Sequence, residues 1–252
     1  MLESWIAEAG LEILKETPSA TLYHAVALLM HTLGRYGVAE DHFRHALALR
    51  TRNLGDNDVA TLESTYRLSC TLSKHTDGVA EADALMQVIA RKTSSEEKKL
   101  RAEKMRGKFK VDAAGHDVAE GVAILRHCVE RFAEAAAKAS KTTADAEAAA
   151  DAKAAAAASK AEESTLRQLF HSEQLLGTGL RVLAAQQHGE GGGNGGALIE
   201  EAVELHTRIA TKWSALDGEE HDNGITAYHE LAKSLWEAGR TARDLKAVQR
   251  SL

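Results

Sequence analysis

The chain has 252 residues, enough for one or two domains, and 44% of them are hydrophobic, which suffices to bury a core. Only 4% are aromatic, Pro18 is the only proline, and runs rich in Val, Ile and Thr are missing, which excludes most sheet-containing folds and favours an all-α fold. The formal net charge of -6 excludes a global attraction to nucleic acid or to anionic membranes.

Neither the cysteines nor the N-terminal residues indicate export. Cys70 and Cys128 are far apart in sequence and form no metal-type pair, which suits buried thiols in a reducing compartment. Glu3, Glu8 and Glu12 are unlike a signal or transit peptide, and no apolar run of about 18 residues occurs. We therefore expect a cytoplasmic protein, with the nucleus as the second choice.

The predicted elements begin with a leading helix over residues 2 to 16, which would cap the array or end a missing repeat. In the next helix, Tyr23, Val26, Ala27 and Met30 share one face because they are spaced by 3, 1 and 3 residues, and Gly34 ends this helix. A second helix presents a small-large-small face, and a polar connector over residues 54 to 58 follows. That face consists of Ala39, Phe43 and Ala46.

The same pattern recurs along the chain. A shift of 42 residues leads from the first set to Thr65, Leu68, Ser69 and Leu72. A shift of 205 leads from the first set and Gly34 to Tyr228, Leu231, Ala232, Leu235 and Gly239. Such self-similarity is typical of stacked helical hairpins, so we predict five helix pairs beginning near residues 19, 57, 94, 164 and 222. Two capping-box spacings, Thr93 to Glu96 and Ser94 to Glu97, support the third start.

Two insertions interrupt the pattern. Residues 133 to 163 contain 17 alanines and no large apolar side chain. We favour an elongated hairpin that turns near residues 140 to 143; a continuous rod and a frayed excursion are the alternatives, and an insertion without specific function is the simplest interpretation. Residues 189 to 196 are glycine-rich, but no Lys-Ser/Thr follows and no strand precedes, so we interpret them as a flexible linker rather than a phosphate loop.

The expected organisation therefore has three parts. Residues 1–132 form N-terminal hairpins with the leading helix, residues 133–163 form the alanine-rich helical insertion, and residues 164–252 form C-terminal hairpins with the glycine-rich loop.

The repeated residues also carry a family resemblance. Ala20-Thr-Leu, Gly34-Arg-Tyr, the Ala39-Glu-x-x-Phe helix and the connector from Leu54 to Thr61 resemble the 42-residue tetratricopeptide repeat of the kinesin light chain type, over most of residues 9–92 and 197–245. The resemblance implies a right-handed superhelix of antiparallel helix hairpins that binds a peptide in its concave groove.

The chain also departs from this family. The paired asparagines that clamp a peptide backbone in the family are replaced by His24-Ala25, Tyr66-Arg67 and His229-Glu230, and the connector prolines are absent. The residues before 19 are too few for the heptad segment of a kinesin light chain, so we do not expect a motor subunit.

A basic run from Lys98 to Lys110 contains a single acid, Glu103. On the first helix of the third pair it would form a positive patch midway along the groove and capture an acidic peptide. A solvated face and a nuclear-localisation run are the alternatives. Nucleic-acid binding would need stacking aromatic side chains beside the charge, and only Phe109 is available.

No residue pattern indicates catalysis, a metal or a cofactor. His42 and His45 share a helix face, but no third ligand has a suitable spacing. No nucleophile elbow or paired buried carboxylates recommend an enzyme.

We therefore predict a non-catalytic scaffold that binds a protein or peptide partner, with an acidic segment as one option and with no nucleic acid, membrane or cofactor. A kinesin-light-chain-like cargo adaptor and a ligand-sensing or enzymatic protein on the same scaffold are the alternatives. The candidate peptide-binding residues all occupy first-helix positions expected to face the groove. They are Thr21, His24, Leu28 and His31, then Glu63, Tyr66 and Lys74, then Lys98, Arg101, Lys104 and Lys108, and finally His229, Lys233 and Trp236.

Overall fold

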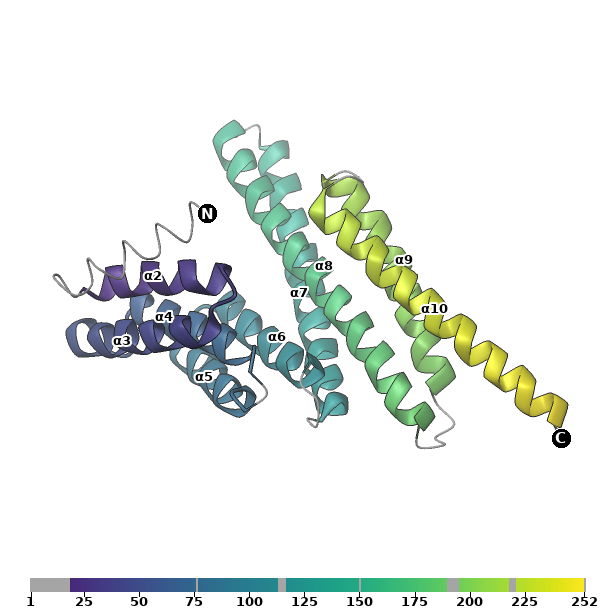
Figure 1. Ribbon diagram of the computed structural model, residues 1–252. Helices are drawn as coiled ribbons and strands as arrows, with labels where there is room; N and C mark the ends of the chain where they lie inside the picture. Colours follow the sequence, from purple (N-terminus) through teal and green to yellow (C-terminus); the bar gives the residue numbers. More distant parts are fainter. Residues whose placement is uncertain are drawn as a thin grey trace. The chain divides into compact units, whose positions relative to one another are not determined.

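The computed structural model describes residues 19–75, 77–112, 117–149, 151–189, 195–217 and 221–251, and these ranges contain nine α-helices and no strand (Figure 1). The predicted all-α fold is therefore confirmed. The chain divides into two compact units, residues 1–115 and residues 116–252. The predicted leading helix over residues 2 to 16 lies outside the described residues.

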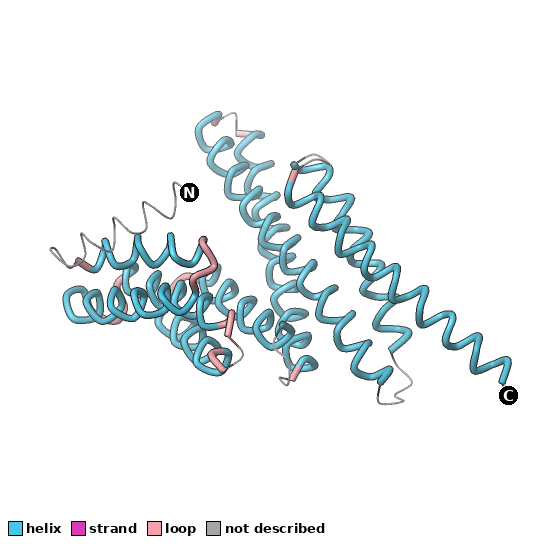
Figure 2. Tube along the Cα trace, viewed as in Figure 1, coloured by secondary structure: helices cyan, strands magenta, loops and turns pink. Residues whose placement is uncertain are grey.

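The described residues of unit 1 contain five helices, and each packs against the next one in sequence. Their bounds are α2 Ala20–Thr32, α3 Tyr36–Leu54, α4 Val59–Leu72, α5 Val79–Lys92 and α6 Glu96–Asp112. The tube in Figure 2 shows that short turns join these helices, as expected for stacked hairpins.

The predicted packing faces form the core of unit 1. Val26, Ala27 and Met30 of α2 are buried, and so is the predicted face of α3 around Phe43. Gly34 has a φ of 73°, a conformation that glycine adopts without a steric cost, and this ends α2 as predicted. Helix pairing in unit 1 thus follows from the large-small-large pattern of the sequence.

The third predicted start is confirmed, but the residue that caps it is a different one. Helix α6 begins at Glu96, and the Ser95 hydroxyl accepts the Lys98 N–H at 3.4 Å. The Thr93 hydroxyl accepts the Ser95 N–H at 3.3 Å, so it supports the turn before the helix. Ser95, and neither Thr93 nor Ser94, therefore caps the N-terminus of α6.

Unit 2 contains four longer helices. Their bounds are α7 Val118–Ala148, α8 Ala152–Gly189, α9 Gly195–Asp217 and α10 Asp222–Ser251. Helix α8 packs against α7, α9 and α10. The predicted part boundaries near residues 132 and 164 lie inside α7 and α8, and the glycine-rich segment falls mostly outside the described residues, between the ends of α8 and α9.

The alanine-rich insertion is an elongated hairpin of α7 and α8, as we favoured, but the chain turns later than residues 140 to 143. The Thr142 and Thr143 hydroxyls bond to carbonyls one helical turn earlier, at 3.0 and 3.2 Å, so the chain stays helical there. Helix α8 then starts where the Asp151 carboxylate accepts the N–H groups of residues 153 and 154.

The fifth predicted helix pair is wrong. Helix α10 starts at the expected place but continues as a single helix to Ser251, so residues 222–251 form one helix and not a hairpin. Without glycine or proline after Gly239 in the sequence, no residue with a strong breaking effect ends the helix there, and Gly239 itself does not stop it.

A close approach between α8 and α9 depends on a glycine. His206 of α9 is fully buried, and a Cβ on Gly177 of α8 would lie only 2.6 Å from the His206 Nε2 atom. The His206 ring also links α9 to both neighbouring helices. Its Nδ1 lies 2.8 Å from the Ser234 hydroxyl of α10, and its Nε2 lies 3.3 Å from the Gln174 carbonyl of α8. Since a carbonyl can only accept, Nε2 carries the proton and Nδ1 accepts from Ser234.

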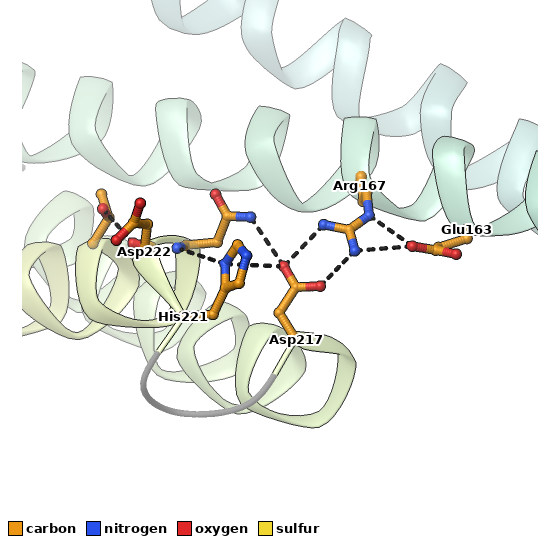
Figure 3. Close-up of polar contacts among 7 residues, drawn as sticks. Glu163, Arg167, Asp217, His221 and Asp222 are labelled. Carbon is orange, nitrogen blue, oxygen red and sulfur yellow. Dashed lines mark hydrogen bonds and ion pairs between the residues drawn. The ribbon is translucent and has the colours of Figure 1, made fainter.

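The end of α9 is tied to α8 and α10 by one carboxylate, Asp217, whose side chain is 4% exposed (Figure 3). Arg167 of α8 donates to both of its oxygens, and Asn223 of α10 donates to it at 3.0 Å. These hydrogen bonds, with those of Arg167 first, lower the pKa of Asp217. Glu163 binds the other side of the same guanidinium at 2.9 Å, in a more exposed position.

We expect Gly177→Ala to destabilise unit 2 by about 1–3 kcal/mol, because the new methyl group overlaps the buried His206 ring. Urea unfolding followed by circular dichroism measures this loss. Gly37→Ala is the matched control, since a Cβ there meets no atom within 4 Å and alanine favours helix. Equal stability of the two variants would contradict the close approach.

We expect Asp217→Asn to lower the free energy of unfolding by about 1–3 kcal/mol, because the amide cannot replace two charge-assisted hydrogen bonds to Arg167. Glu163→Gln removes the exposed partner of the same guanidinium and should cost less than about 1 kcal/mol. Urea titrations at pH 7 compare the two variants, and a larger loss for Glu163→Gln would refute the assignment of Asp217 as the main tie.

Candidate functional site

An open hollow of about 320 Å³ lies on unit 1 between α4, the end of α5 and the start of α6. Four of the predicted peptide-binding residues line it: Glu63, Tyr66, Lys98 and Arg101. The sequence placed these four on the first helices of two successive pairs, and the stacking of α4, α5 and α6 brings them to one surface. The other lining residues are Val59, Leu62, Arg67, Ile89, Thr93 and Ala102.

The charged residues of the hollow are mostly cationic. Arg67 pairs with Glu63 at 2.7 Å, and Arg101 pairs with Glu97 at 2.7 Å; all four side chains are 43 to 56% exposed. Lys98 is exposed, and its amine makes no ion pair with any residue that the structure describes. Because exposed ion pairs are weak, both arginines can exchange their carboxylates for those of a ligand.

The floor of the hollow is apolar. Leu62 and Tyr66 pack on the core of unit 1 and Ile89 belongs to it, while Val59 at the rim is 66% exposed. Burial raises the pKa of the Tyr66 phenol, so the ring is neutral at physiological pH. Burial likewise raises the pKa of the neighbouring Cys70 thiol, which therefore stays protonated and is a poor nucleophile. The hollow offers apolar contact and cationic groups.

His24 and His31 of α2, which we expected to contact a peptide, join α2 to α4. His24 Nδ1 lies 3.2 Å from the Ser64 hydroxyl and 3.3 Å from Arg50, and His31 Nδ1 lies 3.0 Å from the Thr71 hydroxyl. Burial, followed by nearby cations, lowers the pKa of both rings. Both histidines therefore hold successive first helices together.

The remaining predicted residues of unit 1 lie outside the hollow. Lys104 is only 6% exposed, so its assignment as an exposed basic contact is corrected: this turn of α6 faces the protein. Leu28 packs against the core. Lys108 is paired with Asp112, and Thr21 and Lys74 are exposed.

Three predicted residues belong to α10 in unit 2. His229 is exposed, Lys233 pairs with Glu230 at 2.7 Å, and Trp236 is 61% exposed with the Arg240 guanidinium 5.7 Å from its ring centre. These side chains form a surface of their own on unit 2.

Sequence reasoning missed six of the ten lining residues. Arg67 was within reach, because it stands in the Tyr66-Arg67 pair that replaces the two asparagines of the repeat family. Ile89 lies in the last turn of α5, and Thr93 is the residue directly after that helix. Only the packing of α5 against α6 places these two residues at the hollow. No sequence pattern indicated them.

The described residues contain no group of three or more His, Cys, Asp or Glu side chains that could hold a metal ion. Within the same part of the chain, every helix is too short or too polar to cross a membrane.

Comparisons with known proteins agree with this architecture. Residues 18–91, which include α2 to α4 and α5 up to its last residue but one, match the family model of the tetratricopeptide repeat. Two solved structures of putative kinesin light chain repeats from Podosopora anserina, described as nearly identical TPR-like repeats, have similar folds. One, a point variant, has a TM-score of 0.55 at 15% identity and covers 90% of each chain. The other has a TM-score of 0.54 at 16% identity and covers 93% of this chain and 98% of its own.

No curated protein matches the chain significantly. The family match over residues 18–91 confirms the predicted resemblance to tetratricopeptide repeats, and the fold is similar to that of the kinesin-light-chain-type repeats.

We expect stability to fall as the pH is lowered from 7.5 to 5.5. Burial lowers the folded-state pKa of four histidines, His24, His31, His42 and His206, below the unfolded value of 6.5. Their contribution is therefore present above pH 6.5 and is lost as the pH falls below 6.5 toward the lower folded-state pKa. Thermal unfolding followed by circular dichroism across this range measures the loss.

The double variant His24→Gln and His31→Gln should show a smaller loss on acidification, because two of the four groups are gone. His127→Gln changes an exposed histidine of α7 and should leave the pH dependence as it is in the parent. If the double variant kept the full pH dependence, the two histidines could not be its source.

Proposed function

Since residues 18–91 are tetratricopeptide repeats and the chain has the fold of kinesin-light-chain-type repeats, we propose that this protein is a non-catalytic scaffold that binds a peptide of a partner protein in the hollow of unit 1. Helical repeat arrays of this kind commonly present extended binding surfaces to other proteins. The observation that carries the proposal is the combination of an apolar floor and cationic side chains in one hollow on the repeat segment.

The apolar floor suits a large side chain of the ligand. Leu62 and Tyr66 are half-buried and held by core contacts, so they lose little freedom when a ligand covers them. Val59, exposed at the rim, would gain most from being covered. An aromatic or large aliphatic residue of a peptide fits this place.

The charges favour an acidic peptide. Three cations and one carboxylate line the hollow, and Lys98 already lacks a carboxylate partner among the described residues. Exposed cations of this kind steer an anionic ligand to the site and raise its association rate. The partner is therefore a protein with an acidic segment around one apolar anchor.

We expect Lys98→Glu with Arg101→Glu to weaken the binding of an acidic peptide at least about tenfold at low salt, because two attractive charges become repulsive. The probe is a fluorescein-labelled peptide in which one aromatic residue is flanked by Asp and Glu, and fluorescence anisotropy at low and physiological salt measures its affinity. Salt should weaken parent binding, since the charges are exposed.

Lys153→Glu with Lys160→Glu is the matched control, because it makes the same change in net charge on exposed residues of α8 in unit 2. A control variant that loses as much affinity would show that net charge, rather than the hollow, attracts the peptide. Binding that is unchanged in both variants would refute the hollow as the site.

A further inference from the structure

Helix α10 of unit 2 carries a second apolar surface, which is separate from the hollow. Four large apolar side chains of this helix are 43 to 61% exposed. They are Ile225, Tyr228, Leu235 and Trp236. Together with the exposed Ala232 and Gly239 they occupy one face of the helix, because their spacings of 3, 4 and 7 residues return to the same side. We call this face the α10 stripe.

The repeat register shows that this face is a helix-packing face. A shift of 205 residues superposes Tyr23, Ala27 and Met30 of α2 on Tyr228, Ala232 and Leu235. In α2 these positions are covered: the Tyr23 ring stacks on His45 of α3 at 5.1 Å, and Ala27 and Met30 are fully buried. In α10 the same positions are open in this structure: Tyr228 is 43% and Leu235 is 52% exposed, and Ala232 is exposed as well.

The opposite face of α10 is already occupied. Ala227 is 1% exposed, and Ser234 is fully buried and bonded to His206 of α9. Helix α10 packs mainly against α9 and to a smaller extent against α8, and it is the last helix of unit 2 in Figure 1. The Tyr228 hydroxyl of the stripe also accepts a hydrogen bond from Ser214 of α9 at 3.1 Å, while its ring stays 43% exposed. The other large side chains of the α10 stripe are more than half exposed and can meet another helix.

The α10 stripe is complementary to itself in the antiparallel direction. Around Ala232 as the centre, Tyr228 lies four residues before and Trp236 four residues after, while Ile225 lies seven before and Gly239 seven after. Two antiparallel copies would thus place alanine on alanine at the crossing point, Tyr228 on Trp236, and Ile225 on Gly239. A small residue at the crossing lets two helices approach closely, and aromatic pairs add contact energy.

The flanking charges allow the same arrangement. Lys233 is paired with Glu230 at 2.7 Å and Arg240 with Glu237 at 2.9 Å, each within α10. In a symmetric pair of α10 helices, the charged residues beside the stripe of one copy lie near those of the other copy. Their repulsion is weak, because each cation already has a carboxylate partner in its own helix. A partner helix of another protein would need its own small residue opposite Ala232, whereas a second copy supplies it.

We infer that a second copy of this chain covers the α10 stripe, so that two α10 helices pair antiparallel about Ala232 in a symmetric dimer. The interface is isologous, because both copies use the same surface: if residue i of one copy contacts residue j of the other, residue j of the first copy contacts residue i of the second. The contact is small, so the dimer should dissociate on dilution.

Sedimentation velocity of the full chain over a range of concentrations tests the pairing. We expect the parent to shift from monomer toward dimer as the concentration rises. Tyr228→Lys with Leu235→Lys should raise the dissociation constant at least about tenfold, because two apolar contacts are replaced on each side of the axis. Leu54→Lys, at a leucine of unit 1 that is 56% exposed, is the control and should leave it unchanged.

A crosslinking experiment tests the geometry. Ala232→Cys should form a disulfide-linked dimer under mild oxidation, since the axis brings residue 232 of both copies together. Ala215→Cys, at an exposed alanine of α9, should not, and the parent should not because Cys128 is buried and Cys70 half-buried.

A parent that stays monomeric at every concentration would overturn the inference and leave the α10 stripe to a helix of another protein. Dimerisation that survives the lysine substitutions, or crosslinking that is as efficient at Ala215→Cys, would overturn it as well.

Discussion

The structure depends on small residues placed where two helices cross, each next to a large one. Ala27 between Val26 and Met30 lets α2 lie on α3, and Gly177 beside Leu176 lets α8 lie on the buried His206 ring of α9. Because protein interiors are packed as densely as crystals, a methyl group too many at such a point moves a whole helix. The repeated large-small-large pattern of the sequence therefore determines how closely neighbouring helices approach each other.

Histidines bonded to hydroxyl groups provide the second means of joining helices. His24 meets Ser64, His31 meets Thr71, and His206 meets Ser234, and each pair connects two different helices. A neutral ring can both donate and accept, so it satisfies a buried hydroxyl without burying a charge. His24 and His31, which we expected from the sequence to contact a peptide, thus join helices.

The hollow of unit 1 and the α10 stripe of unit 2 differ in chemistry. The hollow of unit 1 combines an apolar floor with Lys98 and two arginines, which suits a peptide with acidic residues. The α10 stripe is apolar along its centre and has its flanking charges already paired, which suits another α10. Binding of a partner and pairing of two copies can therefore occur on separate parts of the chain.

Sequence periodicity by itself determined the all-α class, the packed faces of α2 to α5 and four of the residues at the hollow, because a helix has one period and its apolar side must be buried. It could not show that Lys104 is buried, that His24 and His31 bond to α4, or that α7 continues to Ala148. Those outcomes depend on which side chains neighbouring helices bring to the same place. Only the tertiary structure decided them, since a single helix does not encode its neighbours.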